Sequence, residues 1–141
     1  KKHQPRVMWI VFGQSDDWSH ARRYDLVLDY LRLTDGELAE LWQTLQSMDA
    51  YRGKTTLIVT VDHGRGRTPA DWAEHDVGLQ GSQDIWIAVI GPDTPATGEA
   101  QNVTGVTQSD VAATMLKAMG LDWKDFNPKA GPPIAAAFAP R

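Results

Sequence analysis

The residues of this sequence that could do chemistry are a small set of carboxylates and imidazoles. Aspartate and histidine together suit Zn²⁺ or Mn²⁺ better than Ca²⁺ or Mg²⁺, which prefer shells made only of oxygen. Five ligands exceed what one tetrahedral site needs, and this number favours two metal ions. The five candidate metal ligands are Asp16, His20, Asp62, His63 and His75.

The spacing of these residues also indicates that their side chains come together. Asp16 and His20 are four positions apart, so a helix would project both side chains from one face. Asp62 and His63 directly follow the apolar run 55–61, which reads as a buried strand ended by Gly64. Open α/β sheets hold their ligands at the carboxyl ends of their strands. We therefore expect the candidate ligands to gather at one edge of a sheet.

Two other apolar runs, 6–13 and 84–90, predict further buried strands. Between 21 and 48 the apolar residues recur with helical spacing, and Gly36 is the point where that amphipathic helix could break. Residues 15–17, which follow the first predicted strand, are candidates for the N-cap of a helix. A second helix is predicted over 107–119 with Gly120 as its C-cap.

The remaining segments are predicted to be irregular. Residues 64–83 form a long loop rich in Gly, Asp and Arg, and such a loop inside a compact domain is usually functional or disordered. Residues 95–104 read as a polar surface connection, and the Pro- and Ala-rich tail 128–141 is not assigned. Strands that alternate with helices predict an α/β fold with a mostly parallel sheet. Nearly continuous apolar strands indicate helices on both faces of that sheet, in a single α/β unit over residues 1–141.

Composition narrows the function classes. The net charge is −4, and the 14 Lys and Arg residues are spread out, which gives no electrostatic reason to bind nucleic acid. No apolar run approaches the roughly 18 residues that a membrane span needs. The sequence has no cysteine, which excludes disulfides and thiolate metal sites and leaves the compartment undecided. Because the sequence opens with Lys1 and Lys2, a fragment, a processed product or a trimmed chain is expected.

Several segments carry a resemblance to a known family: Asp16-x₃-His20, 56–64, Trp72-x₂-His75, 86–92 and 108–116, ending at Gly120. In these segments the sequence resembles the alkaline phosphatase superfamily, which contains sulfatases, type I phosphodiesterases and cofactor-independent phosphoglycerate mutases. The resemblance covers most of the chain and keeps the order of the family's motifs. One departure is Asp76, which stands where the family often has Gly.

The resemblance implies an alkaline phosphatase-like fold and a metal-dependent hydrolase of phosphate or sulfate esters. It implies that Asp16, His20 and His75 bind one metal ion, and that Asp62 and His63 bind the other. In the family a Ser or Thr nucleophile near the N-terminus forms a covalent ester that metal-bound water then hydrolyses. No such residue precedes the first predicted strand. The chain therefore resembles an incomplete, C-terminal part of the fold, and by itself it is expected to be inactive.

Several alternatives stay open. The chain could be a metal-binding or assembly module without catalysis, pairing with itself or with the missing N-terminal half. It could be an enzyme that uses metal-bound water directly as the nucleophile. It could also be an α/β domain in which these side chains only cap helices and form hydrogen bonds. Arg65 and Arg67 are candidates to bind a small anionic ester substrate, and solvated loop arginines are the alternative interpretation.

Overall fold

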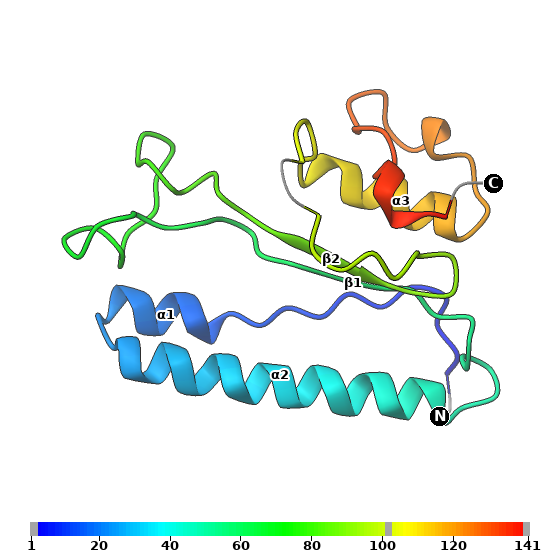
Figure 1. The fold of residues 1–141 in the computed structure, drawn as a ribbon, viewed down its shortest axis with the longest axis horizontal. Helices are drawn as coiled ribbons and strands as arrows, with labels where there is room; N and C mark the ends of the chain where they lie inside the picture. The colour runs from blue at the N-terminus through cyan, green and yellow to red at the C-terminus, as the bar shows by residue number, and fades with distance from the viewer. Residues whose placement is uncertain (1–2, 101–102, 140–141) are drawn as a thin grey trace. The chain divides into compact units, whose positions relative to one another are not determined.

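The computed structural model describes residues 3–100 and 103–139. The other residues are 1–2 at the opening of the sequence, 101–102 in the predicted connection 95–104, and 140–141 at the end of the predicted tail; they lie outside the described residues. The elements follow one another in the order α1 (Gln14–His20), α2 (Tyr24–Gln46), β1 (Leu57–Thr60), β2 (Ile87–Ile90), α3 (Ser109–Ala118) and the 3₁₀ helices η1 (Trp123–Asp125) and η2 (Ala135–Ala137) (Figure 1).

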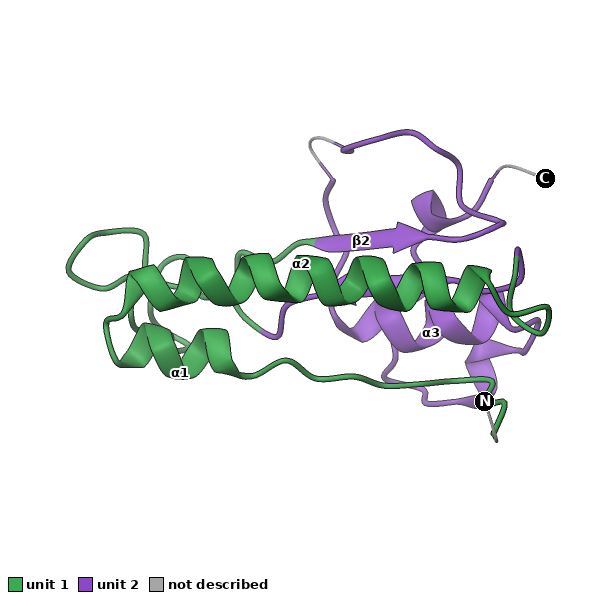
Figure 2. Cartoon of the chain, turned by 90° about the horizontal axis from the view of Figure 1, so that it is seen from below, with its two compact units in different colours: residues 1–52, 63–86 green, residues 53–62, 87–141 purple. Residues whose placement is uncertain are grey.

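The contacts divide the chain into two compact units, each made of two sequence segments (Figure 2). The first unit contains residues 1–52 and 63–86, and the second contains residues 53–62 and 87–141. The sequence predicts one α/β unit over residues 1–141, whereas the contacts of the structure form two compact units. One of the three boundaries between them falls between Asp62 and His63, inside the motif that the sequence singles out.

Two helices of the first unit lie side by side (Figures 1 and 2). Helix α1 begins after Gly13, with Asp16 and Asp17 in its first turn, where negative charge is favoured by the helix dipole. The predicted N-cap at residues 15–17 is therefore wrong by a few positions, because these residues are already helical. Arg22, with φ of 55°, joins α1 to α2. Helix α2 continues through Gly36 without a break, since one interior Gly costs a helix only about 1 kcal/mol relative to Ala.

The strand predicted over residues 6–13 is wrong. This segment is extended but has no strand assignment, and it runs into α1 at Gln14. Most of its apolar side chains are exposed, with Trp9 and Val11 each 73% accessible. An apolar run is buried only where other elements of the fold cover its side chains. Among the described residues the only sheet is the two-stranded one of the second unit.

That sheet overturns the predicted fold class. Strands β1 and β2 pair antiparallel, with Leu57 opposite Ile90 and Thr60 opposite Ile87, so the fold is small and mixed rather than a mostly parallel α/β sheet. Both strands lie where the sequence places them, within 55–61 and 84–90. Their predicted parallel direction is wrong. Two parallel strands must be joined by a crossover connection, usually a helix. Residues 61–86 contain only turns and bends, and they bring the chain back antiparallel.

Helix α3 of the second unit agrees with its prediction. It spans Ser109–Ala118, inside the predicted range 107–119. Its C-cap is Met119, and Gly120, which was predicted as the C-cap, follows it in the left-handed region with φ of 73°. The unassigned tail folds back on α3: Thr114 Oγ1, which is buried, accepts a hydrogen bond from Ile134 N at 2.8 Å. Ala137 in η2 is also buried. Neither α3 nor any other helix in the described part of the chain has the length and apolar character needed to cross a membrane.

Candidate functional site

Three of the predicted ligands come together in the first unit. Asp16 lies on α1, His63 follows β1, and His75 lies in the loop 64–83. Asp16 Oδ1 is 3.7 Å from His63 Nε2 and 3.5 Å from His75 Nε2. Within residues 3–100 and 103–139, these three form the one group of carboxylate and imidazole atoms close enough to share a metal ion. We call Asp16, His63 and His75 the ligand cluster.

His20 lies beside this cluster because it follows Asp16 by one helical turn. Its Nε2 is 3.4 Å from Asp16 Oδ2 and 3.2 Å from His75 Nε2. The predicted placement of Asp16 and His20 on one helix face is therefore confirmed. Four of the five predicted ligands lie in one compact unit.

The fifth predicted ligand, Asp62, belongs to the second unit. There its backbone carbonyl accepts a hydrogen bond from Gln108 Nε2 at 2.6 Å, and the carbonyl of Val61 accepts one from the same nitrogen at 2.8 Å. Gln108 is the N-cap residue of α3, so the start of this helix holds the end of the segment that carries Asp62. The assignment of Asp62 to a second metal ion stays a prediction.

An oxygen atom lies next to the Nδ1 atom of two of the histidines. His63 Nδ1 lies 2.9 Å from the carbonyl oxygen of Gly64, which can only accept, so Nδ1 carries the proton and Nε2 presents its lone pair to the cluster. His20 Nδ1 lies 3.6 Å from Glu74 Oε2, and this carboxylate also contacts Arg22. Carboxylates and carbonyls in such outer positions fix the tautomer and orientation of metal-binding histidines.

The backbone of loop 64–83 approaches itself closely behind His63. Gly64 N donates to Ser82 O at 2.7 Å, and a Cβ on Gly64 would lie 2.5 Å from the carbonyl oxygen of Asp84 and closer still to that of Gly81. The sequence explains Gly64 as the turn that ends a strand. In the structure its φ is not positive, and the requirement is for space between two backbone segments.

The two arginines predicted to bind substrate both pair with carboxylates. Arg65 Nη2 contacts Asp16 Oδ1, and Arg65 Nη1 donates to Ala73 O at 2.8 Å. Arg67 Nε donates to Asp84 Oδ2 at 2.9 Å. Arg65 therefore lies at the ligand cluster, whereas Arg67 pairs away from it.

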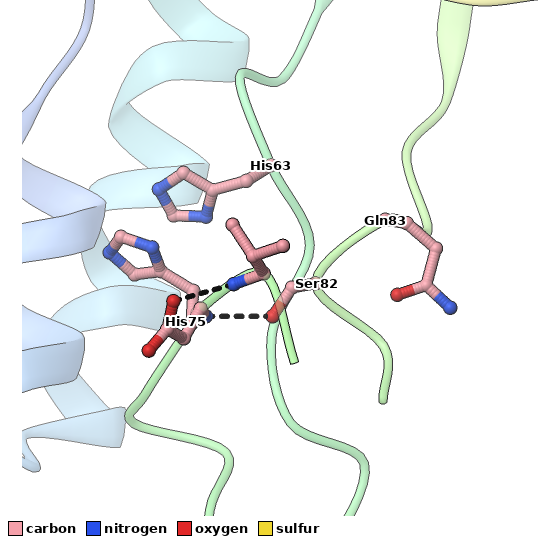
Figure 3. Close-up of a pocket in the computed structure, with 6 residues that line it drawn as sticks. His63, His75, Ser82 and Gln83 are labelled. Atoms are coloured by element: carbon pink, nitrogen blue, oxygen red, sulfur yellow. Dashed lines mark hydrogen bonds between the residues drawn. The ribbon is translucent and has the colours of Figure 1, made fainter. Parts of the chain in front are cut away.

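A pocket of about 510 Å³ opens next to two of the histidines (Figure 3). The rings of His63 and His75 stack at its wall, with centroids 3.6 Å apart and planes inclined by 18°. Ser82 Oγ, also in the wall, accepts a hydrogen bond from Asp76 N at 3.0 Å. Val77 is fully exposed, so the pocket is open to solvent on that side. The lining residues are His63, His75, Asp76, Val77, Ser82 and Gln83.

Sequence reasoning missed some residues of this site. The sequence does not single out Glu74, because its contact with His20 depends on the folding of the loop. Ser82 and Gln83 carry no motif of their own, so nothing in the sequence distinguishes them from other loop residues. The signal available for Glu74 was its position directly before a candidate ligand, because outer carboxylates often accompany metal-binding histidines.

The loop segment before His75 contains a carboxyl group whose titration can be measured. Hydrogen bonds from Thr68 Oγ1 and then Thr68 N lower the pKa of Asp71 below its ordinary value of 3.8. Because the pKa is lowered, the carboxylate stabilises this turn fully above that value, and this contribution is lost as the pH falls through the lowered pKa. We expect Thr68→Ala to raise the pKa of Asp71, as measured by an NMR titration of its carboxyl carbon. An unchanged midpoint would contradict the hydrogen bond from Thr68 Oγ1.

The cluster fits a transition-metal ion by its donor chemistry. One carboxylate and two or three imidazoles are the ligands of Zn²⁺ sites, and Mn²⁺ also accepts them. With bonds of 2.0 to 2.1 Å, ligand atoms around a tetrahedral Zn²⁺ lie about 3.3 Å apart. The distances of 3.5 and 3.7 Å from Asp16 Oδ1 to the two imidazole nitrogens are close to this spacing. The stacked rings of His63 and His75 would have to turn, and the Arg65 guanidinium would have to leave Asp16 Oδ1, before both nitrogens could face one ion. The residues present are therefore compatible with the predicted metal.

The comparisons with known proteins add no assignment to this geometry. No family model matches the chain, and no curated protein or solved structure is significantly similar to it.

Proposed function

We propose that this chain binds Zn²⁺ or Mn²⁺ through Asp16, His63 and His75, and that it is the metal-binding part of a hydrolase of phosphate or sulfate esters. The observation that carries the metal site is the convergence of these three side chains, from a helix and two loop positions, within a single unit. The hydrolase activity rests on the resemblance of the sequence motifs to the alkaline phosphatase superfamily. The second metal ion, at Asp62, rests on that resemblance alone.

In this proposal the residues of the chain have distinct roles. Asp16, His63 and His75 hold the ion, with His20 as a fourth donor one turn along α1. The bound ion would act as a Lewis acid toward an ester oxygen and lower the pKa of bound water. The open pocket beside His63 and His75 provides room for a small anionic ester. No nucleophile is assigned in the chain, so its own turnover is expected to be low.

One observation favours a second candidate function, a metal-binding module without catalysis. The whole ligand cluster lies in the first unit, so metal binding there needs no residue of the second. A hydrolase needs in addition a nucleophile and a way of holding the substrate. The two functions therefore agree on metal binding and differ on turnover.

The test begins with metal binding to the full chain. After treatment with a chelator, the chain is titrated with Zn²⁺ and Mn²⁺ by isothermal titration calorimetry, and we expect near-stoichiometric binding that weakens in His63→Ala. His3→Ala is the matched control, because His3 is exposed and lies outside the cluster. Absence of binding at millimolar metal would reject the site.

The second step measures hydrolysis of an aryl phosphate monoester, an aryl phosphate diester and an aryl sulfate by the metal-loaded chain. Slow, metal-dependent hydrolysis of one ester class, absent from His63→Ala, supports the hydrolase. Stoichiometric metal binding without any hydrolysis favours the non-catalytic module. Rapid turnover would show that the chain contains its own nucleophile.

A further inference from the structure

Arg65 occupies the position at Asp16 that a metal ion would need. Its Nη2 contacts Asp16 Oδ1, which is the same oxygen that faces His63 Nε2 at 3.7 Å and His75 Nε2 at 3.5 Å. The Arg65 side chain is 22% exposed, and its Nη1 is held by the carbonyl of Ala73, a fully buried residue. The guanidinium is therefore part of the site and not a solvated loop side chain.

A guanidinium and a divalent cation compete for this oxygen. Both use its lone pairs, and their like charges repel at short distance. Arginine stays protonated in proteins, so Arg65 cannot reduce this repulsion by losing a proton. The side chain has to move before a metal ion can bind Asp16 Oδ1.

We propose that Arg65 is an internal cation that neutralises Asp16 in the metal-free chain, and that metal binding releases its guanidinium to bind the anionic oxygens of the substrate. This inference rests on the proposed metal site. The released guanidinium has the planar fork that binds phosphate or sulfate oxygens in pairs. The hydrogen bond from Nη1 to Ala73 O keeps it near the cluster.

The exchange couples metal and anion binding. Without metal, Arg65 is engaged by Asp16, so an anion has to compete with that carboxylate. With metal, the guanidinium is available to the anion, and an anion that holds it there removes the competitor of the metal. By thermodynamic reciprocity, metal and anion then tighten each other's binding by the same factor.

Arg67 provides a matched control two residues along the loop. It carries the same charge and also pairs with an aspartate, but its partner Asp84 is not in the ligand cluster. Replacing Arg67 therefore changes the net charge of the loop as much as replacing Arg65 does. A difference in Zn²⁺ affinity between the two variants is therefore due to the contact of Arg65 with Asp16 and not to the net charge of the loop.

The experiment uses the full chain, stripped of metal, in three forms: unchanged, Arg65→Gln and Arg67→Gln. Zn²⁺ affinity is measured by calorimetry at constant ionic strength, with and without sodium sulfate. We expect Arg65→Gln to bind Zn²⁺ at least about 10-fold more tightly than the unchanged chain, and Arg67→Gln to stay within about 2-fold. Sulfate should tighten Zn²⁺ binding several-fold in the unchanged chain and in Arg67→Gln, and not in Arg65→Gln.

The outcomes separate this inference from the proposed function. If the unchanged chain binds Zn²⁺ and Arg65→Gln binds it equally or more weakly, the exchange is rejected and the metal site stands. If only Arg65→Gln binds Zn²⁺, Arg65 blocks the ion instead of exchanging with it, and both the exchange and metal binding by the unchanged chain are rejected. If no form binds, both are rejected.

A spectroscopic measurement covers the case in which Arg65→Gln does not fold. The side-chain NMR signals of Arg65 in the unchanged chain should shift on addition of Zn²⁺ and shift again on addition of sulfate, while those of Arg67 stay in place. Signals of Arg65 that do not move at saturating Zn²⁺ would reject the exchange.

Discussion

Asp16→Asn should reduce the Zn²⁺ affinity of the chain by roughly 100-fold or more, because loss of an outer-shell partner of a metal ligand alone costs 10- to 100-fold. Asp16 is the centre of the cluster: its two oxygens face His63, His75 and His20 within 3.7 Å. Asparagine keeps the shape and removes the negative charge. Arg65 then remains near the site without its carboxylate partner and repels the metal ion further.

Asp17→Asn is the matched control for this prediction. Asp17 is the next residue of α1, has the same charge and is exposed. It lies outside the ligand cluster, so its replacement should change Zn²⁺ affinity by less than about 2-fold, the size expected for a screened surface charge. Calorimetric titration of the two variants beside the unchanged chain makes the comparison. Equal affinities for Asp16→Asn and the unchanged chain would remove Asp16 from the metal site.

Gly64→Ala should destabilise the first unit by about 1 to 3 kcal/mol, the usual cost of forcing extra volume into a well-packed position. The added Cβ would overlap the carbonyl oxygens of Gly81 and Asp84, which belong to backbone and cannot rotate away. The two loop segments would have to separate, and the hydrogen bond from Gly64 N to Ser82 O would lengthen. His63, the preceding residue, would move with them, so Zn²⁺ affinity should fall as well.

Gly78→Ala is the control for Gly64→Ala. A Cβ on Gly78 meets no atom within 4 Å, its φ is not positive, and it lies in the same loop. Urea unfolding followed by tryptophan fluorescence measures the loss of stability in each variant. A midpoint for Gly64→Ala as high as that for Gly78→Ala would mean that the two backbone segments are not in contact.

The local elements of this protein could be predicted from the sequence where a short segment decides its own conformation. The β-branched runs that contain β1 and β2, and the helix before Gly120, depend on side-chain shape and on backbone preferences of neighbouring residues. Helical spacing alone places Asp16 and His20 on one face of α1. These predictions needed no information about distant residues.

The arrangement of the elements could not be predicted in the same way. An apolar strand has the same sequence pattern whether its neighbour is parallel, antiparallel or absent. The sequence therefore could not predict the antiparallel pairing of β1 and β2 or the exposure of Trp9 and Val11. The alternation of predicted strands and helices indicated a mostly parallel sheet, and that prediction was wrong.

For the site, the sequence by itself determined which residues have metal-binding chemistry and the close spacing of Asp16 and His20. Only the tertiary structure decided that His63 and His75 meet Asp16, that Glu74 lies beside His20 and that Arg65 lies on Asp16 Oδ1. The physical reason is the loop 64–83: its path is fixed by backbone contacts such as those of Gly64 with Gly81, between residues far apart in the sequence. Contacts of this kind leave no periodic pattern in the sequence, and they decide which candidate ligands can share an ion.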